Sequence, residues 1–140
     1  MSPITLKAAS GAAEAVKLLS VHDTTGFIGK SQKNGWKVYA AIAPPTKQPS
    51  ALEPTHLNLD SISQSLQNSP CVLLLGGEGT GIKQDLVLLC DYTLSIPGPR
   101  SHQNGLDSLN VSVAAGIMMN GFLAPSTIVE KPKAPPEQLF

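Results

Sequence analysis

Three segments of the chain have the hydrophobic pattern of β-strands. Cys71–Gly76 (CVLLLG) is a continuous apolar run bounded by turn-forming residues. A strand that is apolar on both faces is typical of a parallel sheet covered by helices, so a central strand is predicted here. A second central strand is predicted at Tyr92–Pro97 (YTLSIP). A third is predicted at Trp36–Ala43 (WKVYAAIA), which is rich in aromatic and β-branched residues.

Helices are predicted between these strands from capping residues and from apolar residues at helical spacing. The expected segments are Ser10–Leu19, Thr24–Gly35, Asp60–Asn68, Asp85–Asp91 and Ser108–Phe122. The proline-rich stretch Pro44–Pro54 is expected to be a surface loop. Helices and strands therefore alternate, and this predicts an α/β fold with a mostly parallel sheet flanked by helices. Ligands bind such sheets beyond the carboxyl ends of the strands. Gly76–Gly81 and Pro97–Asp107 are thus the expected walls of one site.

Composition narrows the class of protein. The length of 140 residues fits one domain. Only 14% of the residues are charged, and this predicts that part of the surface is covered by a second subunit. Ten basic residues, of which Arg100 is the single arginine, balance ten acidic ones, so no strong electrostatic footprint for nucleic acid is present. No apolar run approaches the ~20 residues that span a bilayer, and no membrane association is expected. The start of the chain lacks the features of a targeting segment.

The cysteines and histidines do not have the spacing of metal ligands. Cys71 and Cys90 are interpreted as buried free thiols of a reducing compartment. The histidines are expected to be scattered surface or loop residues, and no metal is predicted. They are His22, His56 and His102.

The glycine-rich stretch Gly76–Lys83 (GGEGTGIK) resembles a phosphate loop only superficially. The phosphate loop needs Lys and then Ser or Thr after its last glycine, whereas this chain has Ile82 and Lys83. The carboxylate of Glu78 would also repel a phosphate. The loop instead suits a neutral or cationic ligand held by backbone groups. The alternative is a strand-to-helix turn in which glycine only supplies positive φ.

The predicted helix Ser108–Phe122 begins with small and polar residues (SLNVSVAAG). Small side chains allow a backbone to come close to a ligand or to another helix. Asn110 lies in the expected first turn, where its amide could point into the site. The alternative is that Ser108 is only the N-cap and Asn110 only a satisfied polar group.

Together these motifs resemble the second and third signature motifs of the SpoU (TrmH-like) branch of the SPOUT RNA methyltransferases. The residues are LLLGGEGTGI, LLCDYTLSIPG and DSLNVSVAAGIMM, in that order. The segment SPITLKAASGAAE is similar to the one that follows the first motif in the mitochondrial members that methylate the 2′-hydroxyl of large-subunit rRNA. The resemblance covers roughly Ser2 to Leu123.

The resemblance implies a parallel α/β sheet with a C-terminal deep trefoil knot, a homodimer with the last helix at the interface, and RNA as the partner. It also implies that S-adenosylmethionine is the cofactor and that the compartment is mitochondrial. Carried over by motif, the catalytic residues would be Glu78, Ser108 and Asn110. The cofactor-binding residues would be Leu75, Gly76, Gly77, Glu78, Gly79, Ile96, Pro97, Ser108, Leu109, Asn110 and Ala114.

One departure from the family concerns catalysis. The resemblance assigns activation of the ribose hydroxyl to an arginine of the first motif, and that motif is not found in the sequence. Residues 1–124 are therefore expected to be a catalytic domain without its first motif, and 125–140 a disordered tail. Two functions remain open: a fragment of an rRNA 2′-O-ribose methyltransferase, or a non-catalytic module for cofactor binding and dimerisation.

Overall fold

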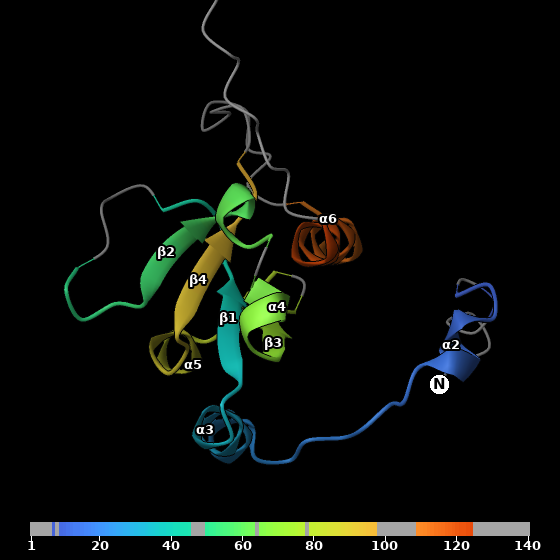
Figure 1. Ribbon diagram of the computed structural model, residues 1–140, viewed down its shortest axis with the longest axis horizontal. Coiled ribbons are helices and arrows are strands. Elements are labelled where there is room, and N and C mark those ends of the chain that lie inside the picture. The colour runs from blue at the N-terminus through green and yellow to red at the C-terminus, as the bar shows by residue number, and fades with distance from the viewer. Residues whose placement is uncertain are drawn as a thin grey trace, which may run out of the picture.

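The computed structural model describes residues 7, 9–45, 50–63, 65–77, 79–97 and 109–124. Within these ranges the sheet has four parallel strands in the order β2-β4-β1-β3 (Figure 1). The strands are β1 (Lys37–Ala41), β2 (Thr55–Asn58), β3 (Cys71–Leu74) and β4 (Tyr92–Ser95). The predicted α/β fold with a parallel sheet is confirmed.

Two strands differ from the prediction: β3 has a different position in the sheet, and β2 was not predicted. β3 was expected to be central, but it lies at the edge of the sheet and is only half-buried along its length. Its apolar residues also fill the two faces of the sheet, and this alone explains the pattern that predicted a central strand. β2 was not predicted, because its four residues (THLN) mix polar and apolar side chains and form no apolar run. β4 is central, as expected.

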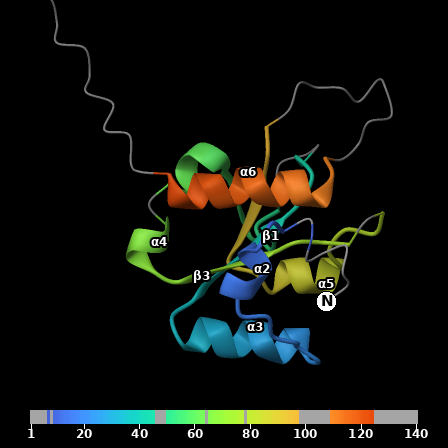
Figure 2. The same cartoon turned by 90° about the vertical axis from the view of Figure 1, so that its right-hand side faces the viewer.

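Helices cover both faces of the sheet (Figure 2). On one face lie α3 (Thr24–Lys33) and α5 (Gln84–Leu88), whose Ile28 and Val87 pack with Val38 and Ala40 of β1. On the other lie α6 (Val111–Leu123), α4 (Ser65–Asn68) and the 3₁₀ helix η1 (Leu59–Ser61). The predicted helix Asp60–Asn68 is therefore divided into η1 and α4, with Ile62 between them fully buried.

Aromatic side chains fasten α6 to the sheet. The ring of Tyr39 on β1 stacks on that of Tyr92 on β4, with ring centroids 5.1 Å apart. The ring of Phe122 on α6 meets the same Tyr39 edge to face, at 5.0 Å. Such aromatic pairs prefer these two geometries, and they add to the free energy gained from burial. The buried side chains of α6 thus reach the middle of the sheet.

Asp91, the residue before β4, joins three elements. Its backbone N–H donates to the carbonyl of Val38 at 2.9 Å, and the N–H of Val38 donates to its Oδ2 at 2.9 Å. The side-chain amide of Gln32 on α3 also donates to Oδ2, at 3.2 Å. Lys37 forms a half-exposed ion pair with Oδ1 at 3.6 Å. Asp91 therefore sets where β4 meets β1 and where α3 lies over them.

The predicted helix Thr24–Gly35 is confirmed as α3. It is capped by Asp23, whose carboxylate accepts from the N–H of Gly26 at 2.9 Å. The predicted helix Ser10–Leu19 is much shorter: α2 (Ala12–Ala15) has no buried residue. Figure 1 shows α2 apart from the sheet, with an extended chain leading to α3. The alanines favour a helix, but no neighbour buries the apolar residues that follow, and Val16 and Leu18 are exposed.

The two cysteines are free. Cys90 is buried, as predicted, and its thiol donates to the carbonyl of Leu86 at 3.2 Å. Burial, with a smaller contribution from the charge of Asp91, raises the pKa of Cys90 to about 11. Cys71 is only half-buried, because β3 is an edge strand; burial raises the pKa of its thiol as well. Within the described ranges, no helix is both long and apolar enough to cross a membrane.

Candidate functional site

The glycine loop leaves β3 at the carboxyl edge of the sheet and turns back on itself. Gly81 donates its N–H to the carbonyl of Gly77 at 3.1 Å, and the two residues form an isolated antiparallel bridge. A Cβ built on Gly76 would lie 2.3 Å from the carbonyl carbon of Gly81. Side chains cannot tolerate such a distance, so glycine is required at position 76 by direct backbone contact.

The outer part of this loop is open. Gly79 has φ +81°, a left-handed conformation that favours glycine, and a Cβ there would meet no atom within 4 Å. Leu75, at the base of the loop, is 39% exposed. Among its described residues, the loop therefore exposes the backbone of Gly77 and Gly79 and the side chains of Leu75 and Thr80.

The second predicted wall leaves β4 at the same edge. Ile96 is half-buried against the core cluster on the α6 face, and Pro97 is exposed. The two walls are not adjacent, because β1 lies between β4 and β3 in the sheet. Ile42, which follows β1, donates its N–H to the carbonyl of Leu94 at 2.9 Å. The segment at Ile42 was not predicted to belong to the site, although it too follows a parallel strand.

The start of α6 supplies the third part of the candidate site. Figure 2 shows this end of α6 toward the same side of the molecule as the chain between β3 and α5. The helix begins at Val111, later than predicted, and its N-cap is Asn110 rather than Ser108. The amide oxygen of Asn110 accepts from the N–H of Ser112 at 2.9 Å. Asn110 thus has the capping role that was predicted for Ser108, and its side-chain NH₂ is the group that could still meet a ligand.

The remaining predicted residues divide into two groups. Leu109 is 52% exposed beside the cap, and Ala114 is half-buried in the second turn of α6. Glu78 and Ser108, both predicted to be catalytic, lie outside the described residues, as do Arg100, His102 and the predicted tail 125–140. The structure therefore brings backbone and apolar groups to one edge of the sheet.

His56 was expected to be a surface or loop residue, and this is wrong: it lies on β2 and is half-buried. Its Nδ1 is 3.0 Å from the hydroxyl of Thr93, and its Nε2 is 3.1 Å from the hydroxyl of Ser95. Burial lowers the pKa of His56 and so favours the neutral ring. The sequence carried no signal for this cluster, because the unpredicted strand β2 creates it.

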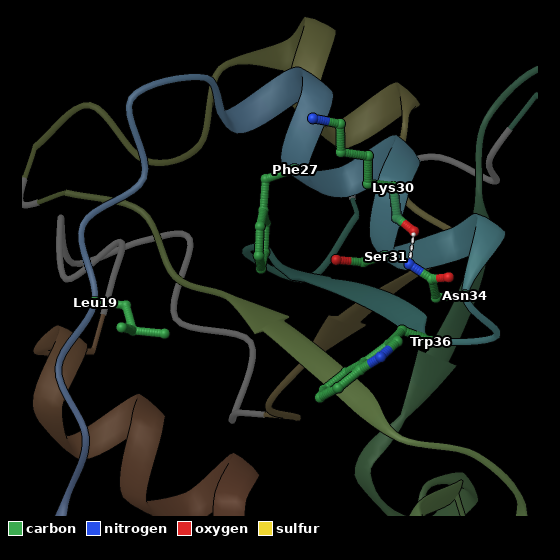
Figure 3. Close-up of a pocket in the computed structure, with 6 residues that line it drawn as sticks. All are labelled: Leu19, Phe27, Lys30, Ser31, Asn34 and Trp36. Atoms are coloured by element: carbon green, nitrogen blue, oxygen red, sulfur yellow. Dashed lines mark hydrogen bonds between the residues drawn. The ribbon is translucent and has the colours of Figure 1, made fainter.

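An open cavity of about 400 Å³ lies elsewhere, between α3, Trp36 and Leu19 (Figure 3). The rings of Phe27 and Trp36 line it, together with polar side chains at the end of α3. Trp36 directly precedes β1, so the cavity is at the amino edge of the sheet, opposite the glycine loop. It is therefore separate from the candidate site.

Comparison with known proteins identifies the family. The profile of the SpoU rRNA Methylase family matches residues 1–120. The human protein named rRNA methyltransferase 1, mitochondrial, is 36% identical over 121 residues, which are 86% of this chain and 33% of that protein. The 23S rRNA (guanosine-2′-O-)-methyltransferase RlmB of Pseudomonas putida is 28% identical over 119 residues, covering 85% of this chain and 41% of the relative.

A solved structure with a similar fold is also that of an rRNA methyltransferase. The AdoMet-bound rRNA methyltransferase from Sinorhizobium meliloti superposes with a TM-score of 0.63 at 25% identity, over 84% of this chain and 39% of that one. The class that the fold defines is that of α/β domains with a parallel sheet flanked by helices. The chain belongs to the SpoU rRNA Methylase family. It spans about a third of the length of the human relative.

The contact between Gly76 and Gly81 leads to a first prediction. Gly76→Ala forces the Gly81 backbone to move, so we expect a loss of about 2 kcal/mol or more in the free energy of unfolding. The measurement is urea denaturation followed by the fluorescence of Trp36, the single tryptophan. Gly29→Ala is the matched control, because a Cβ there meets no atom within 4 Å in helix α3; it should be neutral or stabilising. Equal stability of the two variants would refute the loop contact.

Proposed function

We propose that this chain is the cofactor-binding part of an S-adenosylmethionine-dependent methyltransferase that acts on a ribose 2′-hydroxyl of rRNA. The observation that carries the proposal is the folded-back glycine loop at the edge where the β4 wall and the start of α6 also lie, in a chain of the SpoU family. The names of the human and P. putida relatives, and the AdoMet in the S. meliloti structure, support it.

The residues present fit this cofactor. Its adenine needs apolar walls, and Leu75, Ile96 and Leu109 supply apolar side chains around the carboxyl edge. Its polar groups need hydrogen-bond partners, and the open backbone around Gly79 and the NH₂ group of Asn110 offer them. When bound, the cofactor would supply an electrophilic methyl group on a sulfonium. Glu78, as the family motif implies, would place a carboxylate near that positive charge.

The role of this chain in the reaction would be to hold and orient the donor. Fixing donor and acceptor in a productive geometry contributes much of the rate in such transfers. A ribose hydroxyl is a weak nucleophile and needs help in losing its proton. The resemblance assigns that help to an arginine of the first motif. We do not assign it to Arg100, which belongs to the third-motif loop.

Two finer properties belong to the same proposal. The C-terminal trefoil knot of SPOUT enzymes is supported by the position of β4, the last strand, between β1 and β2, and by α6 packing back over η1 and α4. A mitochondrial location is supported by the names of the relatives from human, Dictyostelium discoideum and two yeasts, each of which is called mitochondrial.

A homodimer through α6 is supported by its exposed apolar face. Val113 and Ile117, four residues apart on the helix, are 50% and 38% exposed, and Met119 and Leu123 are also exposed. A helix that is apolar all round is normally buried on all sides. The other face of α6 is already covered by the sheet, so a second copy of the chain is the proposed occupant of this one.

Cofactor binding is tested by calorimetry on the folded chain. We expect one site per subunit for S-adenosylhomocysteine, and weaker binding of ATP, because the loop lacks the lysine and hydroxyl that a phosphate requires. Denatured protein serves as the control for non-specific heat. Tighter binding of ATP than of S-adenosylhomocysteine would refute the assignment of the cofactor.

Catalysis is tested by the transfer of a tritiated methyl group to large-subunit rRNA, followed by mapping of the modified ribose. We expect little or no transfer by the 140-residue chain alone. A protein extended upstream to include an asparagine–arginine first motif should transfer to a 2′-hydroxyl. If the extended protein binds cofactor and remains inactive, the non-catalytic binding module is the correct function. Robust transfer by the chain alone would place the activating group within it, and Arg100→Ala would then test the single arginine.

The interface is tested with Ile117→Glu. A charge buried in an apolar interface without a partner is strongly unfavourable, so this variant should be monomeric. Leu52→Glu is the matched control, because Leu52 is 90% exposed and lies far from α6 along the chain; it should remain dimeric. Light scattering at high micromolar concentration measures the mass of each. A monomeric unmodified chain would refute the interface.

A further inference from the structure

The cluster of His56, Thr93 and Ser95 spans two neighbouring strands. His56 pairs in register with Thr93, and its ring reaches two residues further along β4 to Ser95. Thr93 and Ser95 are 5% and 3% exposed. Their hydroxyls are therefore shielded from solvent and need hydrogen-bond partners within the protein. One imidazole therefore satisfies both buried hydroxyls through its two nitrogens.

Ser95 is the residue through which this cluster meets the candidate site. The pairing of β1 with β4 ends at Ala41 and Leu94, whereas that of β2 with β4 continues to Asn58 and Ser95. Ser95 is thus the last residue of β4 that the sheet holds, and Ile96 and Pro97 follow it directly. Pro97 has no backbone N–H and cannot donate a hydrogen bond to a neighbouring strand. The direction in which this wall leaves the sheet consequently depends on Ser95.

We propose that His56 is a positioning residue for the cofactor site: its Nε2 holds the hydroxyl of Ser95 and thereby fixes the wall formed by Ile96 and Pro97. The identity of the ligand in this inference, S-adenosylmethionine, rests on the proposed function. The contact between His56 and Ser95 does not depend on it. The bond from Nδ1 to Thr93 has a different task. Thr93 lies in the middle of β4, so that bond stabilises the pairing of β2 with β4 without acting on the wall.

The two nitrogens can be separated by substitution. The side-chain amide of glutamine reaches the position of Nε2, and that of asparagine reaches the position of Nδ1. His56→Gln therefore keeps the bond to Ser95, and His56→Asn keeps the bond to Thr93. We expect His56→Asn to weaken the binding of S-adenosylhomocysteine about tenfold, which corresponds to about 1.4 kcal/mol. His56→Gln should bind within about threefold of the unmodified chain, although each variant loses one bond to a buried hydroxyl.

Matched variants on β4 provide the controls. Ser95→Ala should reproduce the binding loss of His56→Asn, and Thr93→Val should bind as His56→Gln does. Calorimetry measures affinity, and urea denaturation followed by Trp36 fluorescence measures stability. If affinity falls in proportion to stability across the four variants, or if His56→Gln and His56→Asn weaken binding equally, His56 is only structural and the proposal is overturned.

Hydrogen exchange at the Ile96 amide tests the positioning without any ligand. We expect faster exchange in His56→Asn and Ser95→Ala than in His56→Gln and Thr93→Val. An unmodified chain that binds no S-adenosylhomocysteine would refute the proposed function of this chain, and the exchange rates would then decide the role of His56 alone. Equal exchange in all four variants would overturn the positioning role, whatever the affinity shows.

Discussion

The carboxylate of Asp91 is the constraint on which the centre of this structure depends. It accepts from the backbone of β1 and from the side chain of α3, while its own N–H donates to β1. Both backbone hydrogen bonds to β1 are made with Val38, which is fully buried. An unpaired N–H at Val38 would therefore cost about 1–3 kcal/mol of stability. A one-residue slip of β4 would exchange the residues that face α6 for those that face α3. Tyr92 and Leu94 would then leave the aromatic core, and His56 would lose its two hydroxyls.

Most of the candidate site follows from that register, because all its segments except the start of α6 extend a strand whose position is fixed. β3 ends in the glycine loop, β1 in Ile42, and β4 in Ile96 and Pro97. The site contains little ionisable chemistry among the described residues. The described residues of the site offer a ligand mainly backbone groups and apolar side chains. Such a site can select a ligand by the complementarity of its shape.

Much of the fold and part of the site could be predicted from the sequence. The apolar run of β3 and the strand-forming residues of β1 and β4 carry strong local signals, and the glycine loop was located correctly. The helix α3 was predicted from a weaker signal, which ends at Asn34 and Gly35. The failures have a common cause in tertiary context. β2 has no apolar run and becomes a strand only because β4 offers it a partner. The alanines predicted a longer α2, but Val16 and Leu18, which follow its last residue, remain exposed for lack of a neighbour. Asn110 replaces Ser108 as the cap of α6. The contacts of His56 with Thr93 and Ser95 could not be foreseen without the register that β2 adopts.

The strand order has a consequence for how the protein is made. No two strands that are consecutive in the sequence are neighbours in the sheet, since the order is β2-β4-β1-β3. β4, the last to be synthesised, inserts between β1 and β2. Among the four described strands, only β1 and β3 can pair with each other before residue 92 is synthesised, and β2 pairs with β4 alone. Every strand pairing in this sheet joins residues that are far apart in the sequence. Such long-range pairings form slowly, and strand edges stay exposed until they form. While the residues between β2 and β4 are synthesised, the edge of β2 that β4 will cover stays exposed, and exposed strand edges favour aggregation.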